Sequence, residues 1–68
     1  MPEQIKNRVY FLRDKKGITQ EDLAEATGVT RQTIIAIEKG NYTPSVLLAI
    51  NLAKFFKVPV EKVFKISR

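Results

Sequence analysis

Residues 19–40, TQEDLAEATGVTRQTIIAIEKG, contain two short helical patterns separated by a tight turn. The first pattern opens with Thr19 and Asp22, which stand at the spacing of a capping box with Asp in place of Glu. It closes at Gly28, the residue type that most readily takes the left-handed conformation at a helix end. The inner face of this helix is expected to consist of Leu23, Ala24 and Thr27.

The second pattern begins only two residues after Gly28. Thr30 is suited to cap a helix that runs to Lys39 and stops at Gly40. Ala24 lies where two such helices would cross, because a larger side chain there would hold their axes apart. Two helices joined by a short turn that contains Gly form a helix-turn-helix. Three apolar residues are expected to seat its second helix on the core: Val29, Ile34 and Ile37.

Helical spacing of apolar residues predicts three further helices. One runs from about residue 7 to 16, with Asn7 as its cap and Gly17 as its end. Another covers SVLLAINLAKFFK, opened by Thr43 and Pro44, and a last short helix covers about 60–64 after Pro59. The buried stripe of the long helix is expected to be Val46, Ala49, Ile50, Ala53 and Phe56. The tail KISR is expected to pair as a strand with QIKN near the N-terminus.

The amino-acid composition favours some classes of function and excludes others. A chain of 68 residues suits one small domain, and 12 Lys and Arg against 7 Asp and Glu give a net charge of +5, which favours an anionic partner. The absence of Cys and His excludes disulfides, the common zinc sites and histidine acid–base chemistry, so we expect no metal and no cofactor. No stretch has the length of a signal peptide or a membrane span, so we expect a cytoplasmic protein with no membrane partner.

The second helix of the turn motif begins with residue types that read DNA bases. Arg forms two parallel hydrogen bonds to guanine, Gln does the same to adenine, and an aliphatic side chain touches the methyl group of thymine. The outward residues expected to read bases are Arg31, Gln32, Thr33, Ile35 and Ala36. The alternative is a solvated polar face with one stray isoleucine.

Three segments together resemble the Cro and phage-repressor type of helix-turn-helix protein, also called the xenobiotic response element family. They are Arg13, then GITQEDLAEATGVTRQTIIAIEKGNYTPS, then LAKFFKVPVEKVF. The resemblance implies an all-α, compact five-helix, lambda-repressor-like domain over residues 1–68. Its helix-turn-helix would span about 19–39, and its dimerisation region about 58–68.

The resemblance also implies roles for individual residues. Arg13 and Glu38 match an ion pair that ties the first helix to the third, and the alternative is two ordinary surface charges. Thr27 departs from the family, which usually has leucine there, and Tyr10 and Phe11 replace polar residues on the first helix. The residues implied to bind phosphate are Gln20, Thr30, Lys39, Asn41, Tyr42 and Ser45. For the loop residues among them, ordinary turn chemistry is the alternative.

The fourth helix holds more apolar residues than one buried face needs. Leu47, Leu48 and Phe55 lie off its expected stripe, and Val60, Phe64 and Ile66 add apolar surface near the C-terminus. A two-fold homodimer centred on Val60 and Phe64 would cover them, and a tightly packed monomer core is the alternative. A two-fold dimer that binds double-stranded DNA predicts an inverted-repeat operator.

The sequence thus predicts a DNA-binding transcriptional regulator, most simply a repressor. An antitoxin-like protein and an adaptor whose third helix binds another protein are the alternatives, and the run RQTIIA favours DNA over the adaptor. RNA binding is disfavoured because the aromatic and loop signatures of common RNA-binding modules are missing. An enzyme is not expected, since the carboxylates Glu21, Asp22 and Glu25 are suited to solvation and to compensating the helix dipole.

Overall fold

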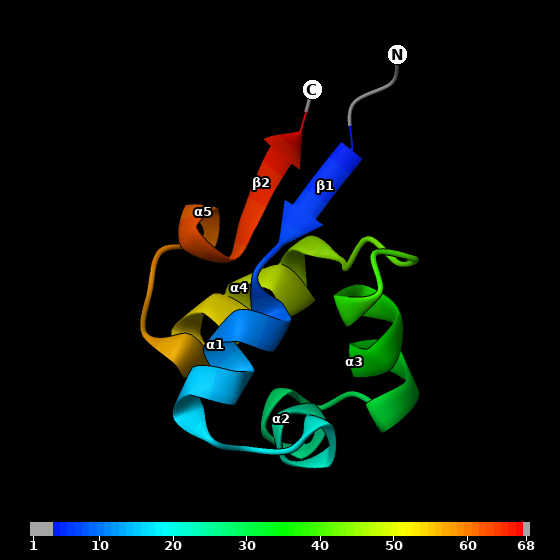
Figure 1. The fold of residues 1–68 in the computed structure, drawn as a ribbon, viewed down its shortest axis with the longest axis vertical. Coiled ribbons are helices and arrows are strands. Elements are labelled where there is room, and N and C mark those ends of the chain that lie inside the picture. The colour runs from blue at the N-terminus through cyan, green and yellow to red at the C-terminus, as the bar shows by residue number, and fades with distance from the viewer. Residues whose placement is uncertain (1–3, 68) are drawn as a thin grey trace.

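The computed structural model describes residues 4–67, and Met1–Glu3 and Arg68 lie outside this range. Five helices form the body, and two short strands stand side by side at one end of it (Figure 1). The elements are β1 (Gln4–Asn7), α1 (Val9–Lys16), α2 (Gln20–Thr27), α3 (Arg31–Glu38), α4 (Val46–Phe56), α5 (Val60–Val63) and β2 (Phe64–Ser67). The five-helix class predicted from the sequence is confirmed. None of the described helices is both long enough and apolar enough to cross a membrane.

The strands join the two ends of the chain. They pair antiparallel, with Ile5 opposite Ile66 and Asn7 opposite Phe64, so the predicted tail pairing is confirmed apart from Arg68, which lies outside the described residues. Where β1 leads into α1, the backbone N–H of Arg8 donates to the carbonyl of Val63 at 2.9 Å. The pairing therefore holds the start of α1 against α5.

One small core lies between the helices. Every helix contributes to it, so each helix buries one side and leaves the other free. The buried apolar residues are Val9, Leu23, Ala24, Ile34, Ile37, Leu48, Leu52, Ala53 and Val63. Thr27 is also buried, and its hydroxyl donates to the carbonyl of Leu23 at 2.8 Å. That bond satisfies the buried hydroxyl group of Thr27.

Local chemistry fixes the turn between α2 and α3. The hydroxyl of Thr19 accepts from the backbone N–H of Asp22 at 3.0 Å, and the Asp22 carboxylate accepts from the N–H of Thr19 at 3.2 Å. This is the predicted capping box. Gly28 ends α2 with φ of 75°, in the left-handed region. The hydroxyl of Thr30 then caps α3 by accepting from the N–H of Thr33 at 3.3 Å. Both predicted caps and the stop at Gly28 are confirmed.

The predictions for α4 were wrong in two respects. The cap is Ser45, whose hydroxyl accepts from the N–H of Leu48 at 3.1 Å, and neither Thr43 nor Pro44 lies in the helix. The predicted stripe is only partly correct, since Ala53 is buried and Phe56 packs against the core, whereas Val46 is 77% exposed and Ile50 45% exposed. The buried α4 residues are Leu48, Leu52 and Ala53. Apolar residues surround this helix, so their spacing allows more than one inward face.

The start of α1 also differs from the prediction. Asn7 belongs to β1, and the helix begins at Val9. The Asn7 side chain still serves this end of the helix, because its oxygen accepts from the N–H of Val9 at 3.1 Å. Its amide nitrogen donates to the carbonyl of Ile37 at 2.9 Å. One side chain therefore connects the start of α1 to the end of α3.

We expect Ala24→Leu to lower the free energy of unfolding by about 1–3 kcal/mol, because Ala24 is only 3% exposed in the core and a larger side chain must displace its neighbours. Urea unfolding followed by circular dichroism would measure the loss. Ala26→Leu is the matched control, because Ala26 is exposed on the same helix, and it should change stability by less than about 0.5 kcal/mol. Equal losses in both variants would contradict close packing at Ala24.

Candidate nucleic-acid interface

The first turn of α3 presents polar side chains to solvent while its later turns enter the core. Arg31 and Gln32 are exposed, and Ile34 and Ile37 are completely buried. Three more predicted base readers, Thr33, Ile35 and Ala36, are half-buried. Arg31 and Gln32 are therefore the most accessible of the predicted base readers, and the three half-buried residues lie beside them.

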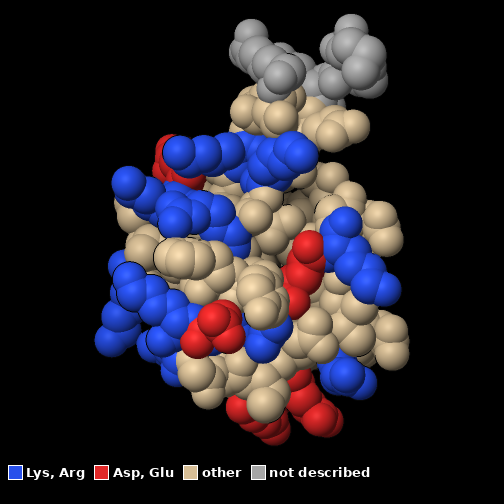
Figure 2. All heavy atoms as spheres, in the orientation of Figure 1, with Lys and Arg blue, Asp and Glu red and all other residues tan. Residues whose placement is uncertain are grey.

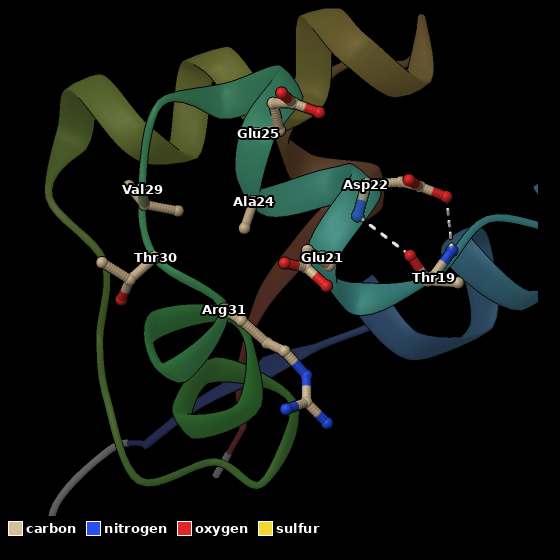
Figure 3. Close-up of a pocket in the computed structure, with 8 residues that line it drawn as sticks. All are labelled: Thr19, Glu21, Asp22, Ala24, Glu25, Val29, Thr30 and Arg31. Atoms are coloured by element: carbon tan, nitrogen blue, oxygen red, sulfur yellow. Dashed lines mark hydrogen bonds between the residues drawn. The ribbon is translucent and has the colours of Figure 1, made fainter.

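Figure 3 shows the Arg31 side chain extending from the start of α3. Arg31 is one of the residues that line a hollow of about 540 Å³. Among residues 4–67, no carboxylate forms an ion pair with Arg31. The other lining residues include Glu21, Asp22 and Glu25. These carboxylates disfavour a phosphate inside the hollow, so an anion is favoured on the outer side of Arg31.

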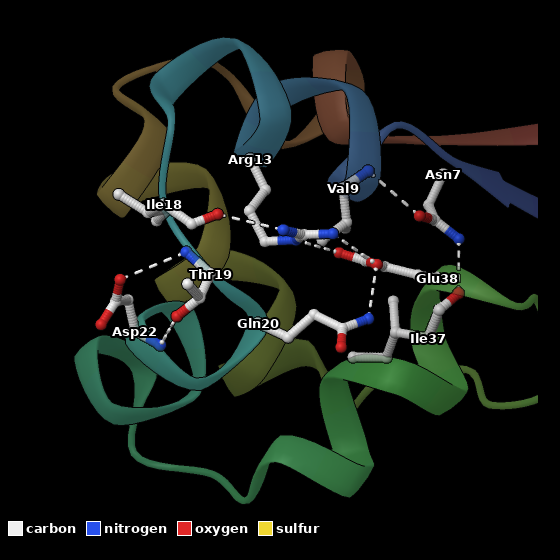
Figure 4. A network of polar contacts seen from close by, with 9 residues as sticks. All are labelled: Asn7, Val9, Arg13, Ile18, Thr19, Gln20, Asp22, Ile37 and Glu38. Carbon is white, nitrogen blue, oxygen red and sulfur yellow. Dashed lines mark hydrogen bonds and ion pairs between the residues drawn. The ribbon is translucent and has the colours of Figure 1, made fainter.

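A second hollow brings Arg31 together with Gln20, which the resemblance assigns to phosphate binding. The Gln20 side chain is half-buried and already engaged, because its amide nitrogen donates to Glu38 Oε1 at 3.0 Å (Figure 4). An amide nitrogen carries two hydrogens, so one remains for another acceptor. The bond to Glu38 was missed from the sequence, since nothing local links residues 18 positions apart.

The Glu38 carboxylate lies at the centre of a network of polar contacts that connects three helices and a loop (Figure 4). Arg13 donates to it twice, from Nε to Oε2 at 2.7 Å and from Nη2 to Oε1 at 3.1 Å. The third guanidinium nitrogen, Nη1, donates to the carbonyl of Ile18 at 3.0 Å. The Arg13 and Glu38 side chains are only 13% and 7% exposed. The geometry is that of a bidentate, largely buried ion pair rather than of two solvated charges.

The hydrogen bond to Glu38 raises the pKa of Arg13 above its ordinary value, and burial opposes this to a smaller extent. A raised pKa in the folded state stabilises the protein below the pKa of the unfolded state, and this contribution disappears as pH rises through the folded value. Both values lie far above neutrality for arginine. Titration of Arg13 therefore gives stability no pH dependence across the neutral range.

The loop after α3 holds the remaining predicted phosphate ligands. Lys39, Asn41 and Tyr42 are exposed, and Tyr42 and Ser45 line a hollow of about 210 Å³ together with Thr33. The hydroxyl oxygens of Thr30 and Ser45 accept the bonds that cap α3 and α4. The Ser45 hydroxyl can still donate its hydrogen to a phosphate. The Thr30 hydroxyl also lies 3.2 Å from the Thr33 hydroxyl, and either of these two can be the donor. The predicted ligands thus lie around α3, with Tyr42 and Ser45 near Thr33 in its first turn and Gln20 bonded to Glu38 at its end.

The three residues predicted to form a dimer interface are not equally accessible. Val60 and Phe64 are half-buried and pack against the core, whereas Ile66 is exposed. Val60 and Phe64 also line an apolar hollow of about 150 Å³. The other residues around this hollow are Ile5, Thr43, Pro44, Val46 and Ala49. The exposed apolar surface is therefore centred on α4 and the strands rather than on α5.

We expect Glu38→Gln to destabilise the fold by about 3 kcal/mol, because it leaves the Arg13 guanidinium largely buried without a carboxylate. Thermal and urea unfolding would measure this. Glu25→Gln removes the same charge from an exposed position and should cost less than about 0.5 kcal/mol. A loss at Glu38 no larger than at Glu25 would show that the ion pair adds little to stability.

Comparison with known proteins agrees with this geometry. A family profile described as helix-turn-helix matches residues 9–63. The chain is 55% identical over 60 residues to an uncharacterized HTH-type transcriptional regulator of Methanocaldococcus jannaschii, covering 88% of this chain and 91% of that protein. It is 35% identical over 54 residues to the cryptic phage CTXphi transcriptional repressor RstR of Vibrio cholerae, covering 79% of this chain and 49% of that repressor.

A solved structure gives the same result for the fold. The restriction-modification controller protein C.AhdI from Aeromonas hydrophila superimposes with a TM-score of 0.76 at 29% identity, covering 81% of this chain and 83% of that protein. The fold, the turn and the outward start of α3 all accord with these matches. The chain therefore belongs to the Cro and C1 type of helix-turn-helix family, whose members are DNA-binding transcriptional regulators.

Proposed function

We propose that this protein is a repressor that binds an inverted-repeat operator as a homodimer, with α3 of each copy in the major groove. The observation that carries the proposal is the exposed start of α3. Arg31 and Gln32 project there with no carboxylate partner among residues 4–67, while Ile34 and Ile37 hold the helix on the core. A groove-reading helix needs both properties, since its readers must be free and its position fixed.

Base readout would follow from side-chain chemistry. Arg31 suits guanine, because its forked donors match the O6 and N7 acceptors, and Gln32 suits the N6 and N7 pattern of adenine. Thr33 lies beside them and reaches a base edge or a phosphate. Ile35 and Ala36 are half-buried, so they would touch thymine methyl groups only when the helix lies deep in the groove.

Phosphate contacts on both sides of α3 would fix its depth and register. Thr30 caps its start, and Tyr42 and Ser45 share a hollow with Thr33 in its first turn. Gln20 bonds to Glu38 at its end, and Lys39 and Asn41 follow that end along the chain. Gln20 would bind phosphate with the amide hydrogen that Glu38 does not use. Glu38 would then orient the Gln20 amide before DNA arrives, which lowers the entropy cost of forming the contact.

Binding by two copies would distinguish the operator from other DNA sites better than one short helix can. One α3 reads only a few base pairs, and two related by symmetry would meet successive major grooves about 34 Å apart. The surface that supports dimerisation is the apolar face of α4 and the strands. Its members are Ile5, Val46, Ile50, Val60, Phe64 and Ile66. Repression rather than activation is supported by the likeness to a phage repressor.

Selection of bound sequences from a random duplex pool tests base readout. The unmodified protein should enrich a palindrome, and Arg31→Ala should lose preference for one guanine in each half-site, a discrimination of about 1–3 kcal/mol. Lys39→Ala should instead weaken all sites alike and reduce the slope of affinity against salt by about one ion. Failure to enrich any sequence would favour a protein-binding adaptor over a DNA-reading regulator.

Analytical ultracentrifugation tests whether the protein forms a homodimer in solution. Val46→Glu should convert a dimer to a monomer at micromolar concentration, because two like charges would face each other across the two-fold axis. Leu47→Glu is the matched control, since Leu47 is the next residue along and is also exposed, yet it lines a different hollow from Val46. Dimers should persist in that variant. A monomeric unmodified protein at high micromolar concentration would rule out the homodimer.

A further inference from the structure

We propose that the outer face of α1 is a docking surface for an acidic peptide segment that carries an apolar anchor, contributed by another protein. The α1 docking surface is defined by Arg8, Phe11, Lys15, Lys16 and Phe55. None of these residues belongs to the proposed DNA contacts or to the proposed dimer face. The inference therefore goes beyond DNA binding and does not depend on it.

Phe11 is the centre of this surface. It is 49% exposed, although the residue type is normally buried. The guanidinium carbon of Arg8 lies 4.7 Å from the centre of its ring, and Lys15 Nζ lies 5.9 Å from it. Two cations are thus gathered around one accessible ring. A carboxylate placed beside Phe11 would meet positive charge on either side.

Lys15, whose ammonium lies near this ring, also lines a hollow that could hold an apolar side chain. Leu12, Phe56 and Val58 give it an apolar lining, and Lys15 and Lys16 add their side chains, around a space of about 270 Å³. Lys16 Nζ also lies 5.5 Å from the ring centre of Phe55. An apolar pocket bordered by ammonium groups is complementary to a leucine or phenylalanine flanked by Asp or Glu.

The positive charges on this surface also favour an acidic partner. Within residues 4–67, neither Arg8 nor Lys15 nor Lys16 forms an ion pair, and Arg13 has its own carboxylate in Glu38. Figure 2 shows many Lys and Arg side chains, with fewer carboxylates among them, on the side of the molecule where Figure 1 places α1 and α5. A concentration of like charge repels itself and attracts acidic partners.

The same features argue against two other occupants. A second copy would bring the same cations against these, which is unfavourable. Single-stranded nucleic acid needs open aromatic faces on which successive bases stack. Here Arg8 and Lys15 are already positioned at the Phe11 ring, and Phe55 packs edge-on against Phe56 with ring centres 5.3 Å apart. An acidic peptide uses the cations and the hollow together.

Titration of the isotope-labelled full chain, followed by amide NMR shifts, tests the proposal. The probe is a synthetic peptide of Asp, Glu, Leu and Phe, compared with a peptide in which Ser replaces Leu and Phe. We expect shifts centred on Arg8, Phe11 and Lys15, and about fivefold weaker binding by the Ser peptide. Phe11→Ala and Lys15→Glu should each weaken binding of the first peptide about fivefold or more.

Lys54→Glu is the charge-matched control, since Lys54 is exposed on the solvent side of α4, and it should change the affinity less than about twofold. Equal losses from Lys15→Glu and Lys54→Glu would overturn the proposal, because only net charge would then matter. So would shifts centred on α3, or tighter binding of an oligo-dT strand to the α1 face. Phe11→Ala should keep the selected DNA consensus, so failure of docking and failure of DNA reading are separable.

Discussion

The carboxylate of Glu38 is the constraint on which the rest of the structure depends. It accepts two bonds from Arg13 and one from Gln20, and Arg13 in turn donates to the carbonyl of Ile18. This single group therefore fixes the end of α3 against α1, the start of α2 and the loop between them. Apolar packing alone is non-directional, and this domain has a small core. Directional bonds at the far end of α3 hold the orientation of the helix whose first turn would enter the groove.

The elements that could be predicted from the sequence are those that residues close together in the chain determine. The capping box of Thr19 and Asp22, the left-handed Gly28 and the cap at Thr30 lie within a few residues of what they control, so their spacing predicts α2, the turn and α3. The face of α4 could not be predicted in this way. Because apolar residues occur around the whole helix, its phase is set by the neighbours that Leu48 and Leu52 meet in the fold.

The same distinction applies to the candidate site. Residue types and helical spacing single out Arg31 and Gln32 as outward readers, because a helix presents fixed faces once its inner residues are known. The bond from Gln20 to Glu38 and the bond from Asn7 to Ile37 join residues 18 and 30 positions apart. No local pattern encodes such contacts. They orient the Gln20 amide and anchor the end of α3 to β1 and α2.

A chain this short cannot bury all its large apolar side chains, and the ones left outside differ in what surrounds them. Val46 shares a hollow with Ile5, Val60 and Phe64, and uncharged residues line it, a setting in which identical surfaces can meet. Phe11 lies between Arg8 and Lys15, where a second copy would be repelled and a carboxylate attracted. Charge thus favours different partners for these two exposed apolar faces. A dimer on α4 would leave the α1 face accessible, so one molecule could hold DNA, its own copy and an acidic partner at the same time.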